Sequence, residues 1–235
     1  MRPYAEQLAK IAAAMRRIGS SQPGETAGTV RLTASEMIAV EYLPPIMQRL
    51  RRDHPRLSIE LVPSNSVEDL PGRAADVAVR VAPPAQQALV AKRIGDVTLG
   101  FHAHRDYLER RGTPASATDL VDHGIIGCDR NMTLMRPVLE RAPVLDPETF
   151  ALKSDSTFVQ LAMIRAGVGI GVTHVAIGQR DPDLVRVLPT VLALTMPVWV
   201  AMHEDLRTSA GCRLLFDTLV SDLTPLLRPD DDACM

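Results

Sequence analysis

The sequence predicts an α/β protein with two doubly wound units, in which mostly parallel strands carry helices on both faces. Two observations predict this class. Short β-branched or apolar runs alternate with helical patterns along nearly the whole chain. In addition, 46% of the 235 residues are hydrophobic, which is enough to bury a sizeable core. The spacing of the elements places crossings between the two units near Gly95 and near Pro197.

The elements follow from the period of the apolar residues. Apolar or β-branched runs predict strands at Val30–Thr33, Leu57–Val62, Ala75–Val81, Val90–Arg93, Val97–Ala103, Ile125–Gly127, Phe150–Lys153, Gly169–Val172, Leu184–Val187 and Val198–His203. Helical spacing predicts helices at Glu36–Asp53, Arg105–Arg111, Ser116–Asp122, Asp155–Ala166, Val175–Gln179 and Ala210–Leu223.

Residues 3–18 are predicted to form a further helix ahead of this alternation. Its apolar residues recur at spacings of 4, 3, 4 and 3 and form a two-heptad seam of Tyr4, Leu8, Ile11, Met15 and Ile18. The seam packs either on its own domain or on a second copy. The flexible composition of Ser20–Ala27 favours the second copy, because a linker would hold the helix away from the domain.

Composition argues against several classes of protein. The net charge of −2 and the eight aromatic residues provide neither a basic stripe nor a stacking platform for nucleic acid. Apolar runs are far shorter than the roughly 20 residues that cross a bilayer, and no secretory signal is visible, so we expect a cytoplasmic protein. Cys128, Cys212 and Cys234 have no metal-ligand spacing, which predicts thiols, and no metal or cofactor is expected.

Catalytic patterns are missing. There is no Gly-x-Ser-x-Gly or His-Glu-x-x-His motif. His102 and His104 would share one face of a strand, but they have no acidic or Cys partner nearby and are predicted to be surface residues. The run Gly167–Gly171 closes a helix and leads into a strand, the reverse of a dinucleotide fingerprint, so Gly167 is predicted to be a helix C-cap. We expect no enzyme activity.

Polar residues at junctions between elements are the candidate binding groups. Ser35 and the turn Pro63–Ser66 follow two predicted strands, where open α/β folds bind ligands. Ser154 or Asp155 is predicted to cap the next helix, either as a cap alone or as part of an anion site. Arg80, at the end of a buried strand, either pairs with an acid such as Asp76 or binds a ligand carboxylate. The same alternatives hold for Arg130 and Asn131.

An ordered series of segments resembles the effector-binding domain of LysR-type transcriptional regulators. The series comprises VRLTASEMIAVEYLPPIMQRLRRDHPRLSIELVPS, ADVAVRVAPP, LVAKRIG, YLERRGTPASATDLVDH and SDSTFVQLAMIRAGVGIGV, and the resemblance extends to about Leu219. It implies two α/β subdomains of the periplasmic-binding-protein-like type 2 fold, joined by crossover strands and preceded by a linker helix. The implied domains are 1–27 (linker and dimerisation helix), 28–95 plus 197–225 (subdomain I), 96–196 (subdomain II) and 226–235 (disordered tail).

The resemblance also implies a small-molecule effector bound between the subdomains. The positions that match the family's pocket are Ser35, Glu36, Met37, Asn65, Ser66, Arg130, Asn131 and Thr133, with Thr173 as a weaker candidate. Family effectors are commonly small organic acids or aromatic metabolites, but Glu36 departs from the small or hydroxyl residues common at its position.

The implied assembly is a homodimer, or a tetramer for a full-length parent. Residues before Gly28 are too few for a winged helix-turn-helix, so we expect DNA binding only through a part absent from this chain. Two alternatives remain at this stage: a free-standing solute-binding protein of the same fold, and a doubly wound α/β enzyme. The effector, the target genes and the direction of regulation stay open.

Overall fold

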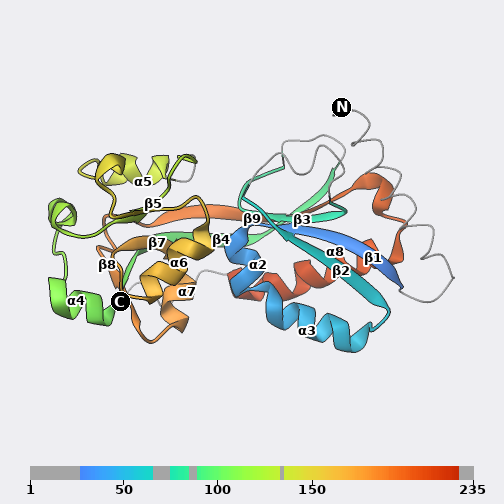
Figure 1. Cartoon of the computed structure of the whole chain (residues 1–235). Helices are drawn as coiled ribbons and strands as arrows, with labels where there is room; N and C mark the ends of the chain where they lie inside the picture. The colour runs from blue at the N-terminus through green and yellow to red at the C-terminus, as the bar shows by residue number, and fades with distance from the viewer. Residues whose placement is uncertain (1–26, 66–74, 85–88, 133–134, 228–235) are drawn as a thin grey trace, which may run out of the picture. The chain divides into compact units, whose positions relative to one another are not determined.

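The computed structural model describes residues 27–65, 75–84, 89–132 and 135–227 (Figure 1). The helix predicted at residues 3–18, its seam and the linker up to Thr26 lie outside these ranges. Leu226 and Leu227 belong to a short 3-10 helix, η5 (Pro225–Leu227), in which Leu227 is buried. These two residues were assigned to the predicted tail at 226–235, of which residues 228–235 lie outside the described ranges.

The chain forms two compact units. Unit 1 comprises the chain up to Asp96 and the chain from Pro197 onwards, and unit 2 comprises Val97–Met196. The chain passes from one unit to the other inside two long strands, β4 (Leu89–His104) and β9 (Leu194–His203). These two strands are hydrogen-bonded neighbours.

Unit 1 contains a sheet in the order β2-β1-β3-β9. β1 (Gly28–Ala34) is parallel to β2 (Leu57–Pro63) and to β3 (Val77–Arg80), whereas β9 is antiparallel to β3. In unit 2, β4 is antiparallel to both β7 (Gly171–His174) and β8 (Leu184–Val187). The expectation of a mostly parallel sheet is therefore wrong: β4 and β9 run against their neighbours and make the sheet mixed.

The described helices of unit 1 lie against one face of its sheet (Figure 1). They are α2 (Glu36–Glu41), α3 (Leu43–Asp53) and α8 (Ala210–Leu223), with the 3-10 turn η4 (Glu204–Leu206) before α8. A side chain at Gly211 of α8 would lie 3.2 Å from both Val30 and Leu57, so this glycine lets α8 approach the sheet closely. Val30 and Leu57 are both buried.

A break at Tyr42 divides the helix that was predicted as continuous over Glu36–Asp53. Pro44 and Pro45 cause it, because their nitrogens carry no hydrogen for bonds to the preceding turn and their rings crowd its carbonyl groups. The second helix, α3, starts anew with these prolines in its first turn, where missing donors do no harm. Tyr42 is buried at the break.

Unit 2 is built from short elements. Its helices are α4 (Arg105–Arg111), α5 (Arg136–Arg141), α6 (Thr157–Arg165) and α7 (Val175–Arg180), with 3-10 turns η2 (Ala117–Asp122) and η3 (Pro147–Thr149). A separate two-stranded sheet pairs β5 (Ile126–Gly127) in parallel with β6 (Leu152–Lys153). The core includes Phe101, Leu120, Val138, Ile170 and Val187. Helix α5 was not predicted.

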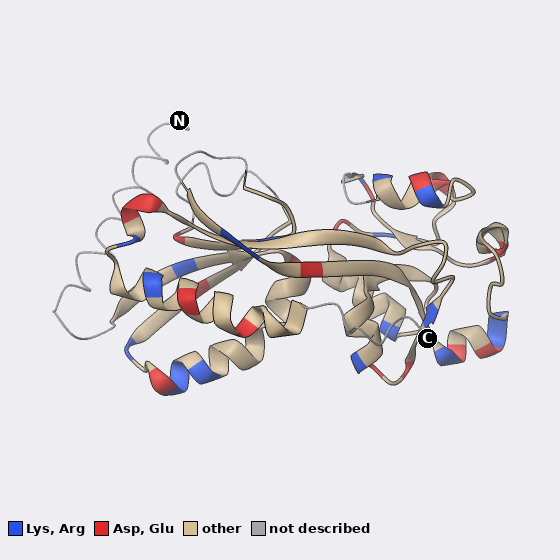
Figure 2. Cartoon of the chain, turned by 180° about the vertical axis from the view of Figure 1, so that it is seen from behind, with Lys and Arg blue, Asp and Glu red and all other residues tan. Residues whose placement is uncertain are grey.

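Charged residues of both signs are interspersed along the described helices (Figure 2). In unit 1 Arg49 of α3 pairs with Asp222 of α8, which ties two helices that are distant in sequence. No helix in the described part of the chain is both long and apolar enough to cross a membrane.

Gly95 lies inside the 16-residue strand β4, where two separate strands were predicted. Its φ of +151° suits glycine, and a Cβ there would lie 2.6 Å from the carbonyl oxygen of Leu227. The glycine therefore marks a close approach of two backbones and does not end the strand.

The glycine run after α6 behaves as predicted. Gly167 has φ +69° and ends the helix: its N–H donates to Ile164 O at 3.0 Å, and the N–H of Val168 donates to Met163 O at 3.1 Å. These two bonds are the Schellman pattern of a helix C-terminus. Two residues on, a Cβ at Gly169 would lie 2.1 Å from Gly124 O, so this position has room only for hydrogen.

Replacing Gly169 by Ala should therefore destabilise the protein by about 2 kcal/mol or more, because two backbones must separate. Gly112→Ala is the control without a close approach: a Cβ there meets nothing within 4 Å, so only the strain of its positive φ of +83° remains, about 1–3 kcal/mol. Urea unfolding of the three proteins measures both effects. A Gly169→Ala midpoint equal to that of the parent protein would contradict the close approach.

Two histidines of unit 2 are buried. His102, predicted to be a surface residue, is 1% exposed, and its Nδ1 lies 3.0 Å from Gly100 O. It is buried because β4 lies between β7 and β8 and because α7 presents Gly178 to the imidazole, where a Cβ would be only 2.3 Å away. Burial lowers the pKa of His102, and burial together with Arg180 lowers the pKa of His174 to about 4.

These histidines should make folding stability depend on pH. A pKa lowered in the folded state means that the unfolded chain binds more protons below its own pKa of about 6.5. The stabilisation is complete above that pH and is lost as the pH falls towards 4, by at most about 1.4 kcal/mol per pH unit for each histidine.

Urea unfolding at pH 7, 5.5 and 4.5 tests this dependence. His174→Gln should flatten the decline between pH 6.5 and 4.5, since a titrating group is removed. The parent protein, measured in parallel at each pH, is the reference. An identical slope in His174→Gln and the parent protein would refute the assignment.

Candidate functional site

Three parallel strands of unit 1 end at the same edge of the sheet, and polar residues gather there. The N–H of Ser35, directly after β1, donates to Val79 O near the end of β3 at 3.0 Å. The N–H of Ser64, directly after β2, donates to Ala34 O at 2.9 Å. These bonds connect the turns after β1 and β2, both of which the sequence singled out, with neighbouring strand ends.

Asn65 supplies the contact that Ser35 was expected to make. Ser35 is the N-cap residue of α2, as predicted, but its side chain makes no capping bond among the described residues. Instead, the N–H of Glu36 donates to Asn65 Oδ1 at 3.1 Å. The structure therefore brings Ser35, Glu36 and Asn65 together. Met37 is buried in the core of unit 1, and Ser66 lies outside the described residues.

Arg80 connects the ends of these strands from within. It is 9% exposed, and its Nη2 donates to Thr33 Oγ1 at 2.7 Å. The Thr33 hydroxyl in turn donates to Val62 O at 3.0 Å. The guanidinium of Arg80 is thus hydrogen-bonded to β1 directly and is linked to β2 through the hydroxyl of Thr33. Thr33 was not predicted from the sequence, because a threonine inside a β-branched run has no distinguishing pattern.

Two further residues, Asp76 and Trp199, lie on strands or turns next to Arg80 and Arg31. Asp76, considered as a partner for Arg80, accepts a hydrogen bond through Oδ2 from the N–H of Arg31 at 2.9 Å. Trp199 of β9 lies opposite Arg80 in the strand register, on the same face of the sheet. Its Nε1 is buried and has no hydrogen-bond partner among the described residues.

Unit 2 has a comparable arrangement where β5 and β6 end. The N–H of Ser154 donates to Gly127 O at 2.9 Å, which extends the parallel pairing by one step. The next residue, Asp155, accepts three bonds through Oδ1, from the N–H groups of Asp129, Arg130 and Asn131 at 3.0, 3.0 and 2.9 Å. Either Ser154 or Asp155 was predicted to cap α6. That prediction is wrong, because Ser156 is the N-cap residue and the Asp155 carboxylate bonds to the remote loop.

The charge of Asp155 is stabilised by these bonds. The N–H of Asn131 is the largest influence that lowers the pKa of Asp155, and the N–H groups of Arg130 and Asp129 also contribute. The side chain of Arg130 is 90% exposed, and its Nε lies 3.4 Å from Asp129 Oδ2. Thr133 lies outside the described residues.

Thr173 differs from the other candidates because it is buried inside unit 2. It lies opposite Gly100 in the pairing of β7 with β4, and its hydroxyl has no hydrogen-bond partner among the described residues. The structure therefore brings Arg130 and Asn131 together, but it leaves Thr173 in the interior.

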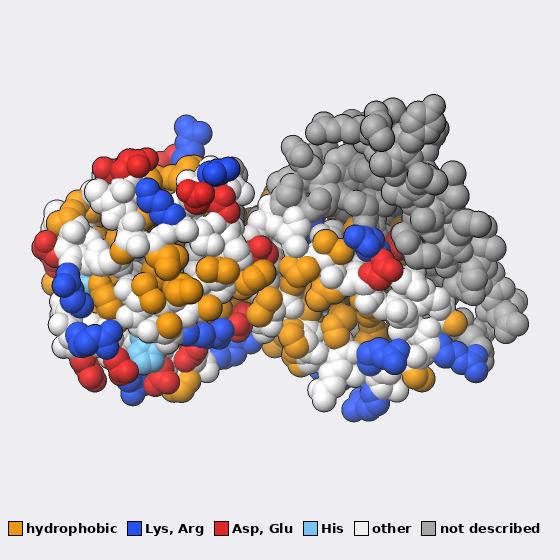
Figure 3. Space-filling model, in the orientation of Figure 1, with side chains coloured by type: hydrophobic (Ala, Val, Ile, Leu, Met, Phe, Trp, Pro, Cys, Tyr) orange, Lys and Arg blue, Asp and Glu red, His pale blue; other side chains and the backbone are white. Residues whose placement is uncertain are grey.

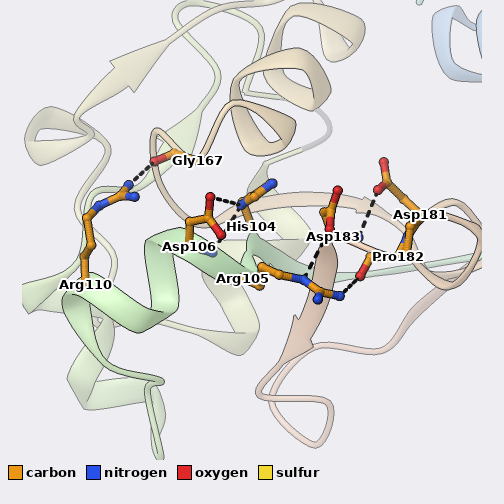
Figure 4. Close-up of polar contacts among 8 residues, drawn as sticks. All are labelled: His104, Arg105, Asp106, Arg110, Gly167, Asp181, Pro182 and Asp183. Atoms are coloured by element: carbon orange, nitrogen blue, oxygen red, sulfur yellow. Dashed lines mark hydrogen bonds and ion pairs between the residues drawn. The ribbon is translucent and has the colours of Figure 1, made fainter.

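The polar groups around the start of α4 are structural (Figure 4). His104 Nδ1 accepts from the N–H of Asp106 at 3.2 Å and so caps the helix. Arg105 binds the turn before β8 through Asp183, with a backbone bond of 2.9 Å and an Nε–Oδ1 distance of 3.3 Å. Arg110 donates to Gly167 O at 3.3 Å.

His203 repeats this capping arrangement before η4: its Nδ1 accepts from the N–H of Asp205 at 3.3 Å. Within the described ranges, no three His, Cys, Asp or Glu side chains are grouped so that they could hold a metal ion.

The family described as LysR substrate binding domain matches residues 23–224. The HTH-type transcriptional regulator PgrR of Escherichia coli is 31% identical over 120 residues, which are 51% of this chain and 40% of that protein. CrgA of Neisseria meningitidis serogroup C is 27% identical over 206 residues, 83% of this chain and 67% of that regulator.

The structural comparison agrees. The regulatory domain of CrgA superposes with a TM-score of 0.72 at 21% identity, covering 84% of this chain and 99% of that domain. This likeness supports the two-subdomain fold. The chain spans about half the length, or less, of the first curated relatives that it matches. Because the family match extends over most of the chain, this protein belongs to the LysR substrate-binding domain family.

Proposed function

We propose that this chain binds a small metabolite as the effector domain of a LysR-type transcriptional regulator and does not transform it. The observation that carries the proposal is the gathering of Ser35, Glu36 and Asn65 at the end of the parallel strands of unit 1, which is where open α/β folds bind ligands. Backbone amides and hydroxyls at such an edge orient a small polar guest.

The charges at this edge suggest the chemistry of the effector. Arg80 is fixed by Thr33, and Glu36 adds an acidic side chain in the first turn of α2. We therefore propose an organic acid or an aromatic metabolite that also carries a hydroxyl or amine donor for Glu36. Arg130 and Asn131 of unit 2 are proposed as further effector contacts.

The ligand acts as a signal in this proposal. A bound molecule shifts an equilibrium between two conformations only by its difference in affinity for them. We propose that this shift reaches DNA through a helix-turn-helix region of a longer cytoplasmic regulator, since the curated relatives are named as HTH-type regulators.

A homodimer is part of the same proposal. Hydrophobic side chains are visible on the surface of unit 1 (Figure 3). Val40 of α2 is 44% exposed, and Leu61 of β2, which pairs only with β1 among the described strands, is 37% exposed. Such side chains would lose contact with water at an interface between two copies.

A thermal-shift screen of small organic acids and aromatic metabolites tests the binding proposal. A ligand at about 100 times its dissociation constant should stabilise the folded protein by about 2.7 kcal/mol. Asn65→Leu should abolish the shift, because it removes the acceptor of the Glu36 N–H and fills the edge. Ser58→Ala, on an exposed part of β2, should keep the shift. A full shift in Asn65→Leu would move the site elsewhere.

Thr33→Val tests whether the Arg80 network supports this edge. The substitution keeps the shape of the side chain but removes the hydroxyl that joins Arg80 to Val62, so we expect a loss of about 1–3 kcal/mol in unfolding free energy and a weaker ligand shift. Thr29→Val, on the same strand, is the control. Equal urea midpoints for the two variants would refute a supporting role for the hydroxyl.

A further inference from the structure

The loop after β5 directs three consecutive backbone N–H groups at a single oxygen atom. They belong to Asp129, Arg130 and Asn131, and the oxygen is Oδ1 of Asp155, at 2.9–3.0 Å from each nitrogen. Successive amides that converge in this way form a concave anion site. Charge-assisted bonds from amides to a carboxylate are also stronger than neutral ones.

We propose that these three amides form a carboxylate-binding site whose resident ligand is the chain's own Asp155, and that the site accepts a free small carboxylate when the Asp155 side chain is removed. The inference goes beyond the proposed function, because it concerns how the amides are occupied and requires no effector.

Sequence distance separates this arrangement from an ordinary helix cap. Asp119 of η2 also accepts two backbone bonds, from Ala115 and Ser116, but these residues are only four and three positions away. Asp155 lies 24–26 positions from its donors. Its carboxylate therefore reaches the amides from a different segment of the chain, as a separate molecule would.

The two sides of the site are held by bonds that do not involve the Asp155 side chain. The N–H of Ser154, next to Asp155, donates to Gly127 O, ahead of the loop that carries the amides, at 2.9 Å. In addition, the buried Gln160 of α6 donates through Nε2 to Ser154 O at 2.6 Å, and the same Nε2 lies 3.6 Å from Cys128 Sγ. The start of the loop and the start of α6 are thus tied together, so the amides should stay aligned without the Asp155 carboxylate.

The site is also accessible and suited to an anion. Asp155 is exposed to solvent, so a small carboxylate can approach the position that its oxygens occupy. The lowered pKa of Asp155 has the N–H of Asn131 as its largest cause, which indicates that the amides favour the charged form of their ligand. The same amides should then favour acetate over a neutral analogue of its shape.

Amide hydrogen exchange at residues 129–131 tests the proposal in the whole chain. Asp155→Ala should raise the exchange rates of these amides by about ten- to a hundredfold, as expected for losing charge-assisted bonds. Tens of millimolar sodium acetate should restore the protection in Asp155→Ala and leave the parent protein unchanged. Acetamide, with ionic strength matched by sodium chloride, should restore nothing.

Asp119→Ala is the matched control, since it removes a second carboxylate of unit 2 that accepts backbone bonds. It should expose the amides of Ala115 and Ser116 and leave those of residues 129–131 protected. Unchanged exchange at 129–131 in Asp155→Ala would overturn the role of the resident carboxylate. Equal effects of acetate and acetamide, or no effect of acetate, would overturn the binding site.

The parent protein provides a test that needs no substitution, in case Asp155→Ala does not fold. The carboxyl carbon of Asp155 should titrate, by NMR, at a pH below that of an aspartate in an unstructured peptide. The protection of the 129–131 amides should fall together with that titration. The proposal would be refuted by an Asp155 pKa equal to that of an unstructured peptide. It would also be refuted if the protection of the 129–131 amides did not change as Asp155 titrates. These readouts need no effector, so a failed ligand screen leaves them unaffected.

Discussion

A buried guanidinium needs polar partners inside the protein, and the strand ends of unit 1 that carry the candidate binding groups are arranged around this requirement. Taking the charge of Arg80 out of water would cost several kcal/mol if nothing replaced its hydration. Thr33 accepts from the guanidinium and donates a second bond to Val62 O, so part of the hydrogen-bonding capacity of Arg80 links neighbouring strands. The turns that carry Ser35 and Asn65 start from these same strand ends. A substitution that disturbs Arg80 therefore disturbs the positions of the candidate binding groups as well.

In unit 2, the charged group at the end of the parallel strands is an anion and not a cation. There the charge is an exposed carboxylate, and backbone amides stabilise it. Both arrangements place a charged group where parallel strands end, because amide and carbonyl groups no longer used by the sheet are available there. A side-chain cation in one unit and a side-chain anion in the other thus fix the loops that the family resemblance implies for effector binding.

Glycine determines how closely the elements of each unit approach. Gly169 lets one backbone pass Gly124, Gly178 makes room for the imidazole of His102, and Gly211 lets α8 reach the sheet. The buried His102 and His174 are consequences of such packing, and both stay neutral at the cost of stability in acid. The fold persists at 21% identity to the CrgA regulatory domain, which fits a structure specified by apolar patterning and a few close approaches.

The sequence by itself determined the family, the alternation of elements and the bounds of those with clear local patterns. Arg105–Arg111, Leu184–Val187 and Ala210–Leu223 have the predicted ends, and Gly167 caps its helix, because these features depend on residues within one or two turns. The tertiary structure alone decided the mixed strand directions, the burial of His102 and the partner of Asp155. Each of these depends on groups far apart in the chain, and local periodicity contains no information about which distant donor or neighbour the folded backbone will bring into contact.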